Sequence, residues 1–263
     1  MNFRQMLAQD RPVLGMYVSC PDLAVAEIIV RSGIDYIRID LEHGMLDYTA
    51  VANLVRLSTI AGVPVQARVS DLSDITRLLD LGVTGIFVPD VETAEYAKKL
   101  VEKVKYAPLG MRGMNNNPRF LNYNSAGFQD YVKTANEEVL LGIQLESRTA
   151  VEHIDEILSV EGIDMVSSGK GDLSQSYGVA GNISHPVVVE TENYILRKAI
   201  EHGKIPTALS TSAERTAALY RQGVRMVTIG TDLQVIRDAM CGMTAAHRAC
   251  AAGAGEKGEE DHG

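Results

Sequence analysis

Short apolar runs, rich in β-branched residues, recur along the chain and alternate with stretches in which apolar residues repeat every three or four positions. The short runs have the length and composition of buried strands. Eight strands are predicted, at Val13–Val18, Ile34–Ile39, Val63–Val69, Thr84–Val88, Val139–Leu145, Ile163–Ser167, Ile205–Leu209 and Arg225–Ile229. Most of them follow a glycine, the residue that often ends a helix just before a strand. These glycines are Gly33, Gly62, Gly82, Gly162, Gly203 and Gly223.

The longer stretches predict amphipathic helices. In Asp22–Ser32, for example, Leu23, Ala26, Ile29 and Val30 fall on one face. The other predicted helices are Tyr48–Ala61, Asp71–Leu81, Glu92–Lys105, Ser147–Val160, Pro186–His202, Ser212–Gln222 and Asp232–Ala249. Several begin with a residue type that caps helix N-termini, namely Asp71, Thr93, Ser212 and Asp232.

Eight alternations of strand and helix within about 250 residues predict an α/β fold, the (β/α)₈ TIM barrel, as a single domain over residues 1–250. A doubly wound open sheet is the alternative. It is disfavoured because no Gly-x-Gly-x-x-Gly follows the first strand and no Walker-type phosphate loop is present.

One segment interrupts the alternation. Tyr106–Glu138 is inserted between the fourth helix and the fifth strand, and it includes a short predicted helix at Gly127–Asn136. An insertion of this length is usually functional, so it predicts a lid or a wall of the site. Residues 251–263 are rich in glycine and acidic residues and predict a disordered acidic tail.

Composition narrows the range of partners and the cellular location. The 263 residues carry a net charge of −9, without a cluster of Lys and Arg, which argues against nucleic acid or an anionic membrane as partner. No apolar run approaches the length of a membrane span, and the first residues do not resemble a signal peptide. The scattered cysteines Cys20, Cys241 and Cys250 suit a reducing cytoplasm. We therefore expect a cytoplasmic protein that binds any anionic substrate through a metal, an arginine or backbone N–H groups.

Ionisable residues gather at the carboxyl ends of the predicted strands, where barrel enzymes carry their active sites. They are Asp40, Glu42 and His43 after the second strand, Arg68 at the end of the third, Glu146 with the polar Gln144 at the end of the fifth, and Lys170 and Asp172 of Gly169-Lys170-Gly171-Asp172 after the sixth. The carboxylates of Glu146 and Asp172, with no cysteine nearby, predict a site for a hard divalent cation, Mg²⁺ or Mn²⁺.

Each residue also has a purely structural interpretation. Arg68 could pair with an acid at a strand end, and such ion pairs are common and weak. Asp172 could cap a helix or turn, and Asp232, after Gly230 and Thr231, is interpreted as an N-cap. No function is assigned to His153, His185, His202, His247 or His262.

Taken together, these residues resemble the HpcH/HpaI aldolase and citrate lyase family. The resemblance rests on Asp40-Leu41-Glu42-His43-Gly44, Arg68, Gly110-Met111-Arg112-Gly113, Gln144-Leu145-Glu146 and Gly169-Lys170-Gly171-Asp172-Leu173-Ser174, in this order and spacing, and covers the chain to about residue 245. The best-known members are metal-dependent pyruvate aldolases, such as 4-hydroxy-2-oxoheptanedioate aldolase and 2-dehydro-3-deoxyglucarate aldolase.

The resemblance implies a role for each matching position. His43 is then the general base and Arg68 stabilises an enolate, with Asp40 beside them in the catalytic group. Pyruvate and the cation follow from the other motifs: Gln144 and the backbone N–H of Gly171 hold pyruvate, and Glu146 and Asp172 bind Mg²⁺ or Mn²⁺, with Co²⁺ a further candidate.

The resemblance also implies an assembly. It assigns Asp80 to raising the basicity of the histidine, yet Asp80 ends a helix at the barrel face opposite His43. Asp80 can therefore act only across a subunit interface, which fits a homo-oligomer and, by resemblance, a hexamer. The chain departs from the family at Leu41, where a small residue is common, and at Gly169-Lys170-Gly171-Asp172, where Gly-Pro-Ala-Asp is typical. Both departures reshape the pocket for the aldehyde.

The resulting hypothesis is a class II aldolase that reversibly cleaves a 4-hydroxy-2-oxo acid to pyruvate and an aldehyde. One alternative is a Claisen-type enzyme of the same family acting on oxaloacetate or an acyl-CoA, and another is a non-catalytic barrel that binds a 2-oxo acid. A third possibility concerns mechanism: Lys170 could form a Schiff base with the substrate. The position of Lys170 between two glycines predicts a flexible turn with a solvated charge, which argues against that role.

Overall fold

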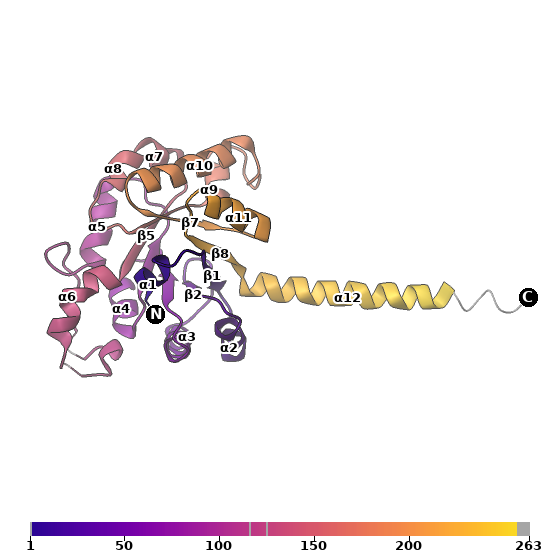
Figure 1. The fold of residues 1–263 in the computed structure, drawn as a ribbon, viewed down its shortest axis with the longest axis horizontal. Coiled ribbons are helices and arrows are strands. Elements are labelled where there is room, and N and C mark those ends of the chain that lie inside the picture. Colours follow the sequence, from indigo (N-terminus) through magenta and orange to yellow (C-terminus); the bar gives the residue numbers. More distant parts are fainter. Residues whose placement is uncertain (1, 116, 125, 257–263) are drawn as a thin grey trace, which may run out of the picture.

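The barrel predicted from the sequence is confirmed. The computed structural model describes residues 2–115, 117–124 and 126–256, and its eight parallel strands close in chain order, so that the first strand pairs with both the second and the eighth (Figure 1). The strands are β1 (Val13–Val18), β2 (Tyr36–Asp40), β3 (Val65–Arg68), β4 (Gly85–Val88), β5 (Leu140–Leu145), β6 (Met165–Ser168), β7 (Ile205–Leu209) and β8 (Met226–Thr231).

The predicted helices follow the strands, with shifts at their ends, and three further short helices over 3–7, 119–121 and 170–176 are additions to the prediction. They are α1 (Phe3–Leu7), α2 (Leu23–Arg31), α3 (Tyr48–Ile60), α4 (Ile75–Leu81), α5 (Ala94–Val104), the 3₁₀ helix η1 (Arg119–Leu121), α6 (Phe128–Glu138), α7 (Arg148–Glu152), α8 (Ile154–Leu158), α9 (Lys170–Ser176), α10 (Pro186–Glu201), α11 (Ala213–Arg221) and α12 (Asp232–Glu256). The six glycines predicted to end helices all have φ between 67° and 108°, the left-handed region that favours glycine.

Two of the four predicted helix caps are wrong. Thr93 and Ser212 do cap α5 and α11. The carboxylate of Asp71, however, accepts the N–H of Ser73 and closes a local turn, so α4 begins only at Ile75. Asp232 lies inside α12 instead of before it.

The carboxylate of Asp232 accepts the backbone N–H groups of Ser19 and Cys20, at 3.0 and 2.9 Å, and so joins the start of α12 to the end of β1. The hydroxyl of Thr231 takes the capping position by accepting the N–H of Gln234. The predicted helix Ser147–Val160 is also divided, because the backbone leaves the helical conformation at His153 (φ −100°, ψ 15°).

The half of the barrel interior nearest the amino ends of the strands is filled by packed side chains. Phe3 and Met6 of α1 close the amino-terminal end and pack with Tyr36, Phe87, Met165 and Met226 from the strands. Small residues make room for the rings: a Cβ atom on Gly15 would lie 2.0 Å from Tyr36, and one on Gly142 would lie 2.3 Å from Phe87. This packing leaves only the carboxyl ends of the strands open for a site.

The inserted segment lies at the amino ends of the strands. Arg119 donates to the carbonyl oxygen of Leu81 at the end of α4, and no described residue of 106–138 lines the cavity at the carboxyl ends. The inserted segment is therefore not a lid or wall of the cavity in its own chain, and that prediction is wrong. The reason is topological, because a helix-to-strand connection in this fold leaves the helix at the amino ends of the strands.

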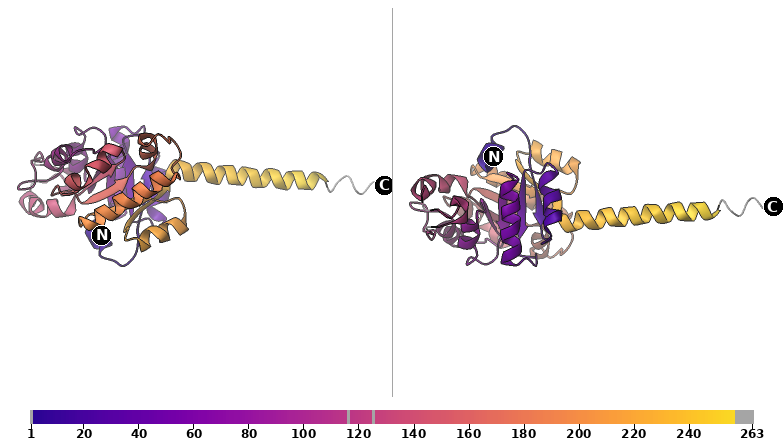
Figure 2. Two further views of the ribbon diagram at one scale, coloured as in Figure 1. Left: turned by 90° about the horizontal axis from the view of Figure 1, so that it is seen from above. Right: turned by 90° about the horizontal axis from the view of Figure 1, so that it is seen from below.

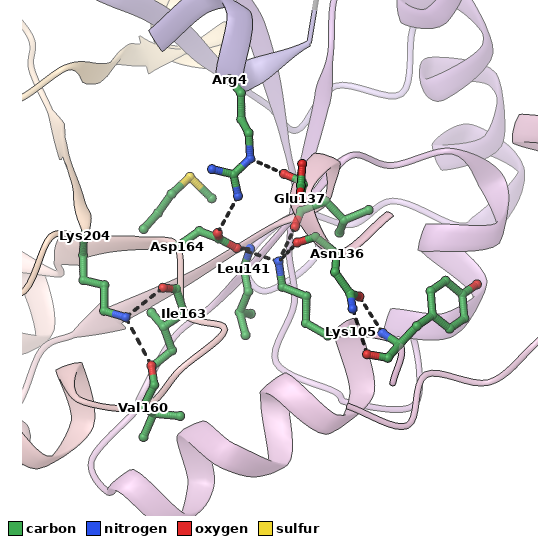
Figure 3. Close-up of polar contacts among 12 residues, drawn as sticks. Arg4, Lys105, Asn136, Glu137, Leu141, Val160, Ile163, Asp164 and Lys204 are labelled. Atoms are coloured by element: carbon green, nitrogen blue, oxygen red, sulfur yellow. Dashed lines mark hydrogen bonds and ion pairs between the residues drawn. The ribbon is translucent and has the colours of Figure 1, made fainter. Parts of the chain in front are cut away.

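A buried ion pair fixes the inserted segment to the barrel (Figure 3). The ammonium of Lys105, which is 1% exposed, lies 2.8 Å from the carboxylate of Asp164 and donates to the carbonyl oxygens of Asn136 and Val139. The same carboxylate accepts the N–H of Leu141 in β5 and contacts Arg4. The helix α6 is thus joined to β5 and to the loop before β6.

The last helix leaves the barrel and projects into solvent (Figures 1 and 2). Every residue from Leu233 to Ala251 is exposed. The helix runs to Glu256, so the predicted disordered tail is wrong for residues 251–256, where the alanine-rich run from Ala245 favours helix. Residues 257–263 lie outside the described residues. No helix in the described part of the chain is long and apolar enough to cross a membrane.

Candidate active site

A cavity of about 540 Å³ opens at the carboxyl ends of the strands. Its lining includes residues from most strands: Tyr17 of β1, Arg38 and Asp40 of β2, Arg68 of β3, Gln144 of β5, Ser167 of β6, Leu209 of β7 and Thr231 of β8. Of the predicted site residues, Asp40, Arg68, Gln144, Gly171 and Asp172 line this cavity.

Arg68 is held by the two acids that follow β2. Its Nε and Nη2 donate to the two oxygens of Asp40 at 2.9 and 2.7 Å, and its Nη1 lies 3.0 Å from Glu42. The pairing of β2 with β3 explains the contact between Arg68 and Asp40, since these two residues lie opposite each other on the neighbouring strands. The guanidinium also stacks on the ring of Tyr17, 4.9 Å from its centroid. Arg68 therefore has one fixed orientation at the mouth of the barrel.

The pKa values of the two acids, Asp40 and Glu42, are shifted in opposite directions. Burial alone raises the pKa of Asp40, but the hydrogen bonds and charge of Arg68 outweigh burial and hold that pKa below its ordinary value. For Glu42 the balance is reversed, and burial raises its pKa despite the nearby guanidinium. Asp40 is thus the permanent anion of the group, and Glu42 is the acid that exchanges a proton more readily.

His43 lies at the outer end of this group. Its side chain is 67% exposed, and its Nε2 lies 3.7 Å from a carboxylate oxygen of Glu42. Its backbone N–H, like that of Glu42, points to Asp40. Asp40 therefore shapes the turn that carries the imidazole as well as orienting Arg68.

Glu146 is a buried carboxylate without a cationic partner among the described residues. It is 3% exposed, and it accepts hydrogen bonds from the backbone N–H of Asp90 and the side-chain amide of Gln144. Burial raises its pKa to about 7, and the negative charges of Asp90 and Asp172 add to this effect. Gly169 is required beside it, because a Cβ atom there would lie 1.8 Å from a carboxylate oxygen of Glu146.

The residues around Glu146 suit a hard cation. A buried carboxylate whose pKa is raised, in part by the charge of a second carboxylate, Asp172, is stabilised when a cation binds near both. Within the described ranges, no group of three or more His, Cys, Asp or Glu side chains could hold a metal ion. Two carboxylates leave the remaining coordination positions to water or substrate oxygens, which is the usual arrangement for Mg²⁺ rather than for a structural Zn²⁺.

The loop after β6 differs from the prediction. Gly169 precedes α9, which begins at Lys170, so Lys170 is not in a flexible turn. Its side chain is only 19% exposed, lines the cavity and lies 3.5 Å from Glu192 of α10. The prediction of a solvated Lys170 is therefore wrong, because the start of α9 turns this residue toward the barrel. Gly171 faces open space, since a Cβ atom on it would meet nothing within 4 Å.

Asp80 has its own partners in the same chain. It lies at the end of α4, on the face that carries the inserted segment, where it accepts a hydrogen bond from Asn115 and lies 3.5 Å from Arg112. The guanidinium of Arg112 is fully buried and stacks on Tyr106 at 4.7 Å. The structure thus brings Asp80 to Gly110-Met111-Arg112-Gly113, and not to His43.

Several residues of the cavity were not singled out from the sequence. Arg38 is 3% exposed, donates to Gln66 and Tyr17, and lies 4.1 Å above the ring of Phe87. Its position could have been found by counting back two residues from Asp40, because alternate residues of a strand share a face. Glu192 and Arg215 lie on helices, where no strand periodicity indicates the cavity.

The chain resembles known proteins over most of its length. Residues 13–239 match the family model described as HpcH/HpaI aldolase/citrate lyase. A hydroxypyruvate/pyruvate aldolase of Deinococcus radiodurans is 36% identical over 240 residues, covering 89% of this chain and 85% of the relative. A 5-keto-4-deoxy-D-glucarate aldolase of Escherichia coli O157:H7 is 32% identical, covering 90% of this chain and 93% of the relative.

Among solved structures, the citrate synthase SbnG superposes with a TM-score of 0.88 at 30% identity, covering 95% of this chain and 99% of the other. The fold, the order of the motifs and these similarities agree. The chain belongs to the HpcH/HpaI aldolase/citrate lyase family, a family of carbon–carbon lyases.

Proposed function

We propose that the protein is a class II aldolase that reversibly cleaves a 4-hydroxy-2-oxo acid to pyruvate and an aldehyde. The observation that carries the proposal is Glu146, a buried carboxylate whose pKa is raised to about 7 by burial and by the charge of Asp172, a residue that lines the same cavity as Arg68. Such a pair is suited to a divalent cation, and Arg68 adds a fixed positive charge where an enolate forms. The aldolase names of the relatives support this choice.

In cleavage, the proton of the substrate 4-hydroxyl passes to His43 as the C3–C4 bond breaks. The aldehyde leaves, and the electron pair of that bond becomes the enolate of pyruvate. His43 then returns a proton to C3, which becomes the methyl group of pyruvate. Glu42, 3.7 Å from the imidazole, stabilises its protonated form during the exchange.

The other residues bind and orient the keto acid. Arg68, held by Asp40 and Glu42, donates to the enolate oxygen without having to reorient. Gln144 and the backbone N–H of Gly171 hold the carboxylate end of the substrate. Glu146 and Asp172 would hold a divalent cation, which when bound would supply Lewis-acid stabilisation of the same negative charge.

The test is a screen for pyruvate release from a set of 4-hydroxy-2-oxo acids, with a coupled dehydrogenase as readout. We expect activity with added Mg²⁺, Mn²⁺ or Co²⁺ and its loss in EDTA, and we expect Glu146→Gln to be inactive under all these conditions. Covalent labelling of Lys170 by borohydride and pyruvate, together with full activity in EDTA, contradicts the proposal and supports a Schiff base.

A Claisen-type lyase or synthase is the second candidate, and the superposition with the citrate synthase SbnG supports it. A second assay, compared with the pyruvate-release screen, decides between the two. Condensation of oxaloacetate with acetyl-CoA, measured as released thiol, favours this candidate if it exceeds pyruvate release from every hydroxy-oxo acid. A barrel that only binds 2-oxo acids shows neither reaction.

We also propose that the chain forms a homo-oligomer in which α12 of one copy packs on the barrel of another. An apolar groove of about 550 Å³ lies beside α11, lined by Leu14, Ala213, Ala217 and Ile229 among others. Ile229 of β8 is 36% exposed, although outward residues of barrel strands are normally covered by a helix. This groove is where the last helix of a barrel usually packs, and here α12 projects away from it (Figures 1 and 2).

The face around Asp80 supports the same assembly. Met111 and Met114 of the inserted segment are 81% and 68% exposed, and Tyr123 is 64% exposed. Exposed apolar side chains gathered in one segment are typical of a protein interface. We propose that this face meets the mouth of a neighbouring barrel and brings Asp80 toward the neighbour's His43, within a hexamer.

A further inference from the structure

A second guanidinium is buried in the barrel close to Arg68. Arg38 of β2 is 3% exposed and lines the same cavity as Arg68. Its Nε donates to Oε1 of Gln66 at 2.9 Å, and its Nη1 donates to the hydroxyl oxygen of Tyr17 at 3.1 Å. Its remaining nitrogen, Nη2, is buried without a hydrogen-bond partner, and no acidic side chain of the described residues forms an ion pair with Arg38.

Strand register places this arginine one layer below the residues that orient Arg68. Arg38 lies opposite Tyr17 of β1 and opposite Gln66 of β3. Alternate residues of a strand share a face, so the next layer toward the carboxyl ends holds Asp40 and its register partner Arg68. Arg38 is therefore a positive charge beneath the ion pair at the mouth of the barrel.

The buried charge of Arg38 is costly for the fold. A guanidinium stays protonated in a protein, so burial cannot remove the charge. The rings of Phe87, Tyr17 and Tyr36, whose centroids lie 4.1, 5.2 and 5.9 Å from its central carbon, offset this cost only in part. Apolar side chains of similar size often replace buried charges without loss of stability. Packing alone therefore does not account for an arginine at this position.

Tyr17 connects Arg38 to the site. The guanidinium of Arg68 stacks on the ring of Tyr17, 4.9 Å from its centroid, while the hydroxyl at the end of the same ring accepts the N–H of Arg38. The ring therefore cannot change its angle to Arg68 without breaking the hydrogen bond to Arg38. A donor stabilises a developing negative charge best when it is already in place as the charge forms.

We propose that Arg38 is a positioning residue, which holds the ring of Tyr17 and, through that ring, keeps Arg68 in the orientation that stabilises the enolate of pyruvate. This inference rests on the proposed aldolase function and adds a residue to its site. Arg38 acts through Tyr17 and does not contact the substrate itself.

The experiment compares Arg38→Met, Tyr17→Phe and the double variant. Tyr17→Phe keeps the ring and removes only the oxygen that accepts from Arg38. With added Mn²⁺ and a 4-hydroxy-2-oxo acid that the wild-type protein cleaves, both single variants should lower kcat about tenfold and leave KM nearly unchanged. The double variant should be no slower than the slower single variant, because both substitutions break the same contact.

Ligand binding separates positioning from a structural role. Oxalate resembles the enolate of pyruvate in shape and charge, so its affinity reports how well Arg68 meets that charge. We expect the Kd of oxalate, measured by calorimetry with added Mn²⁺, to rise about tenfold in Arg38→Met and in Tyr17→Phe. The Kd of pyruvate should change by less than about threefold, because pyruvate carries no enolate charge.

Stability provides a further readout. The free energy of unfolding of Arg38→Met in urea should equal or exceed that of the wild type, since the variant removes a buried charge that has no acidic partner among the described residues. Thr207→Val is the control, because it changes another fully buried polar side chain of a barrel strand, one that does not line the cavity. It should leave kcat and the Kd of oxalate unchanged.

If both single variants keep the kcat and the oxalate affinity of the wild type, the inference is wrong and the proposed function stands. Lower stability in Arg38→Met, together with normal oxalate affinity in Tyr17→Phe, also overturns it, because Arg38 then serves the fold. Tyr17→Phe is the smaller change and decides the result if Arg38→Met does not fold. If the wild-type protein cleaves no 4-hydroxy-2-oxo acid, the proposed function fails, and the inference with it.

Discussion

At the scale of single residues, the site is built around Arg68 and the acids that hold it. The sequence predicts Asp40, Arg68, Gln144, Glu146 and Asp172 because all of them end, or closely follow, strands that a barrel brings together. It does not predict which acid pairs with which cation. That depends on strand register and on helix packing, as the pairing of Glu192 with Arg215 shows.

The first residue-scale prediction concerns His43. His43→Ala should lower kcat by about 10²-fold or more and leave pyruvate binding nearly unchanged, because a general base acts mainly in the transition state. Exchange of the pyruvate methyl protons with D₂O, followed by NMR, measures the proton abstraction directly and should fall to the same extent. His153→Ala, at an exposed histidine outside the cavity, is the matched control. Normal exchange in the His43 variant removes this residue from the mechanism.

The second residue-scale prediction concerns how the stability of an Arg68 variant depends on pH. Its contacts hold the pKa of Asp40 below the ordinary value, so the stability that Asp40 contributes is present above that value and is lost as pH falls through the lowered pKa. In Arg68→Met, burial is no longer opposed, and the pKa of Asp40 rises instead. The variant should then be destabilised by about 3 kcal/mol at neutral pH. The deficit should shrink toward pH 4, where Asp40 and Glu42 become protonated.

Urea unfolding of both proteins at pH 7 and at about pH 4.5 measures this difference. The free energy of unfolding of the variant should approach that of the wild type in acid. A deficit of the same size at both pH values means that Arg68 stabilises the fold through packing on Tyr17 rather than through charge.

At the scale of secondary-structure elements, all eight strands and most of the helices between them could be predicted, because each has a clear apolar period; the short helix α9 is not predicted. The errors lie where a side chain has a use outside its own element. The sequence predicts a cap at Asp232, but its carboxylate accepts a backbone N–H group just after β1, and Asp71 closes a turn instead of opening a helix. Periodicity describes which face of a helix is buried, and it does not describe these local hydrogen bonds.

The element-scale prediction concerns the buried pair of Lys105 and Asp164 (Figure 3). Asp164→Asn leaves the ammonium of Lys105 buried without a counter-charge, and burial already lowers the pKa of Lys105. We expect a loss of about 3 kcal/mol in the free energy of unfolding. The same substitution in a Lys105→Met background should cost much less, since no charge is then stranded.

Asp155→Asn is the control for this pair, because it removes an exposed carboxylate that pairs with Lys198 on the surface. Its cost should be below about 1 kcal/mol. Additive effects of Lys105→Met and Asp164→Asn in urea unfolding contradict the prediction, because they show that the two charges are not coupled.

At the scale of the whole molecule, the sequence predicts the barrel but not the course of its last helix. Gly230 and the capping hydroxyl of Thr231 would precede α12 whether the helix packed on its own barrel or projected from it. The apolar residues of α12 suit packing on its own barrel or on another. The direction of α12 is fixed by contacts at its first turn, where Asp232 bonds to Ser19 and Cys20. A pairing between residues so distant in sequence is not visible in a local pattern.

The exposed face of α12 gives the first whole-molecule prediction. Ile236 and Met240, 42% and 60% exposed, lie four residues apart and so share one face of the helix. Replacing both by Asp should reduce the proposed oligomer to smaller species in sedimentation velocity, because the charges cannot be buried in the groove beside α11. Gln234→Asp, on the opposite face, should leave the mass unchanged. An unchanged mass in the double variant shows that α12 does not hold the subunits together.

The last prediction tests whether a site takes residues from two chains. His43→Ala and Asp80→Asn should each be nearly inactive as pure proteins, the first for lack of the base and the second because the neighbour's histidine loses its carboxylate. Asp80→Asn keeps a hydrogen-bond acceptor for Asn115, so the inserted segment remains in place. When the two variants are co-expressed with different tags and the mixed oligomers are isolated, some sites combine an intact His43 with an intact Asp80. Activity should therefore return in the mixed oligomers and be absent from each parent.

Co-expression of His43→Ala with Arg68→Met is the matched control, because both residues come from the same barrel mouth and no mixture restores a complete site. Its mixed oligomers should stay inactive. If the His43 and Asp80 variants also give inactive mixtures, Asp80 acts only on Arg112 within its own chain, 3.5 Å away, and the loss of activity in Asp80→Asn is structural. If wild-type chains are fully active as monomers in sedimentation, the shared site is excluded altogether, because no second chain is then present to supply the carboxylate.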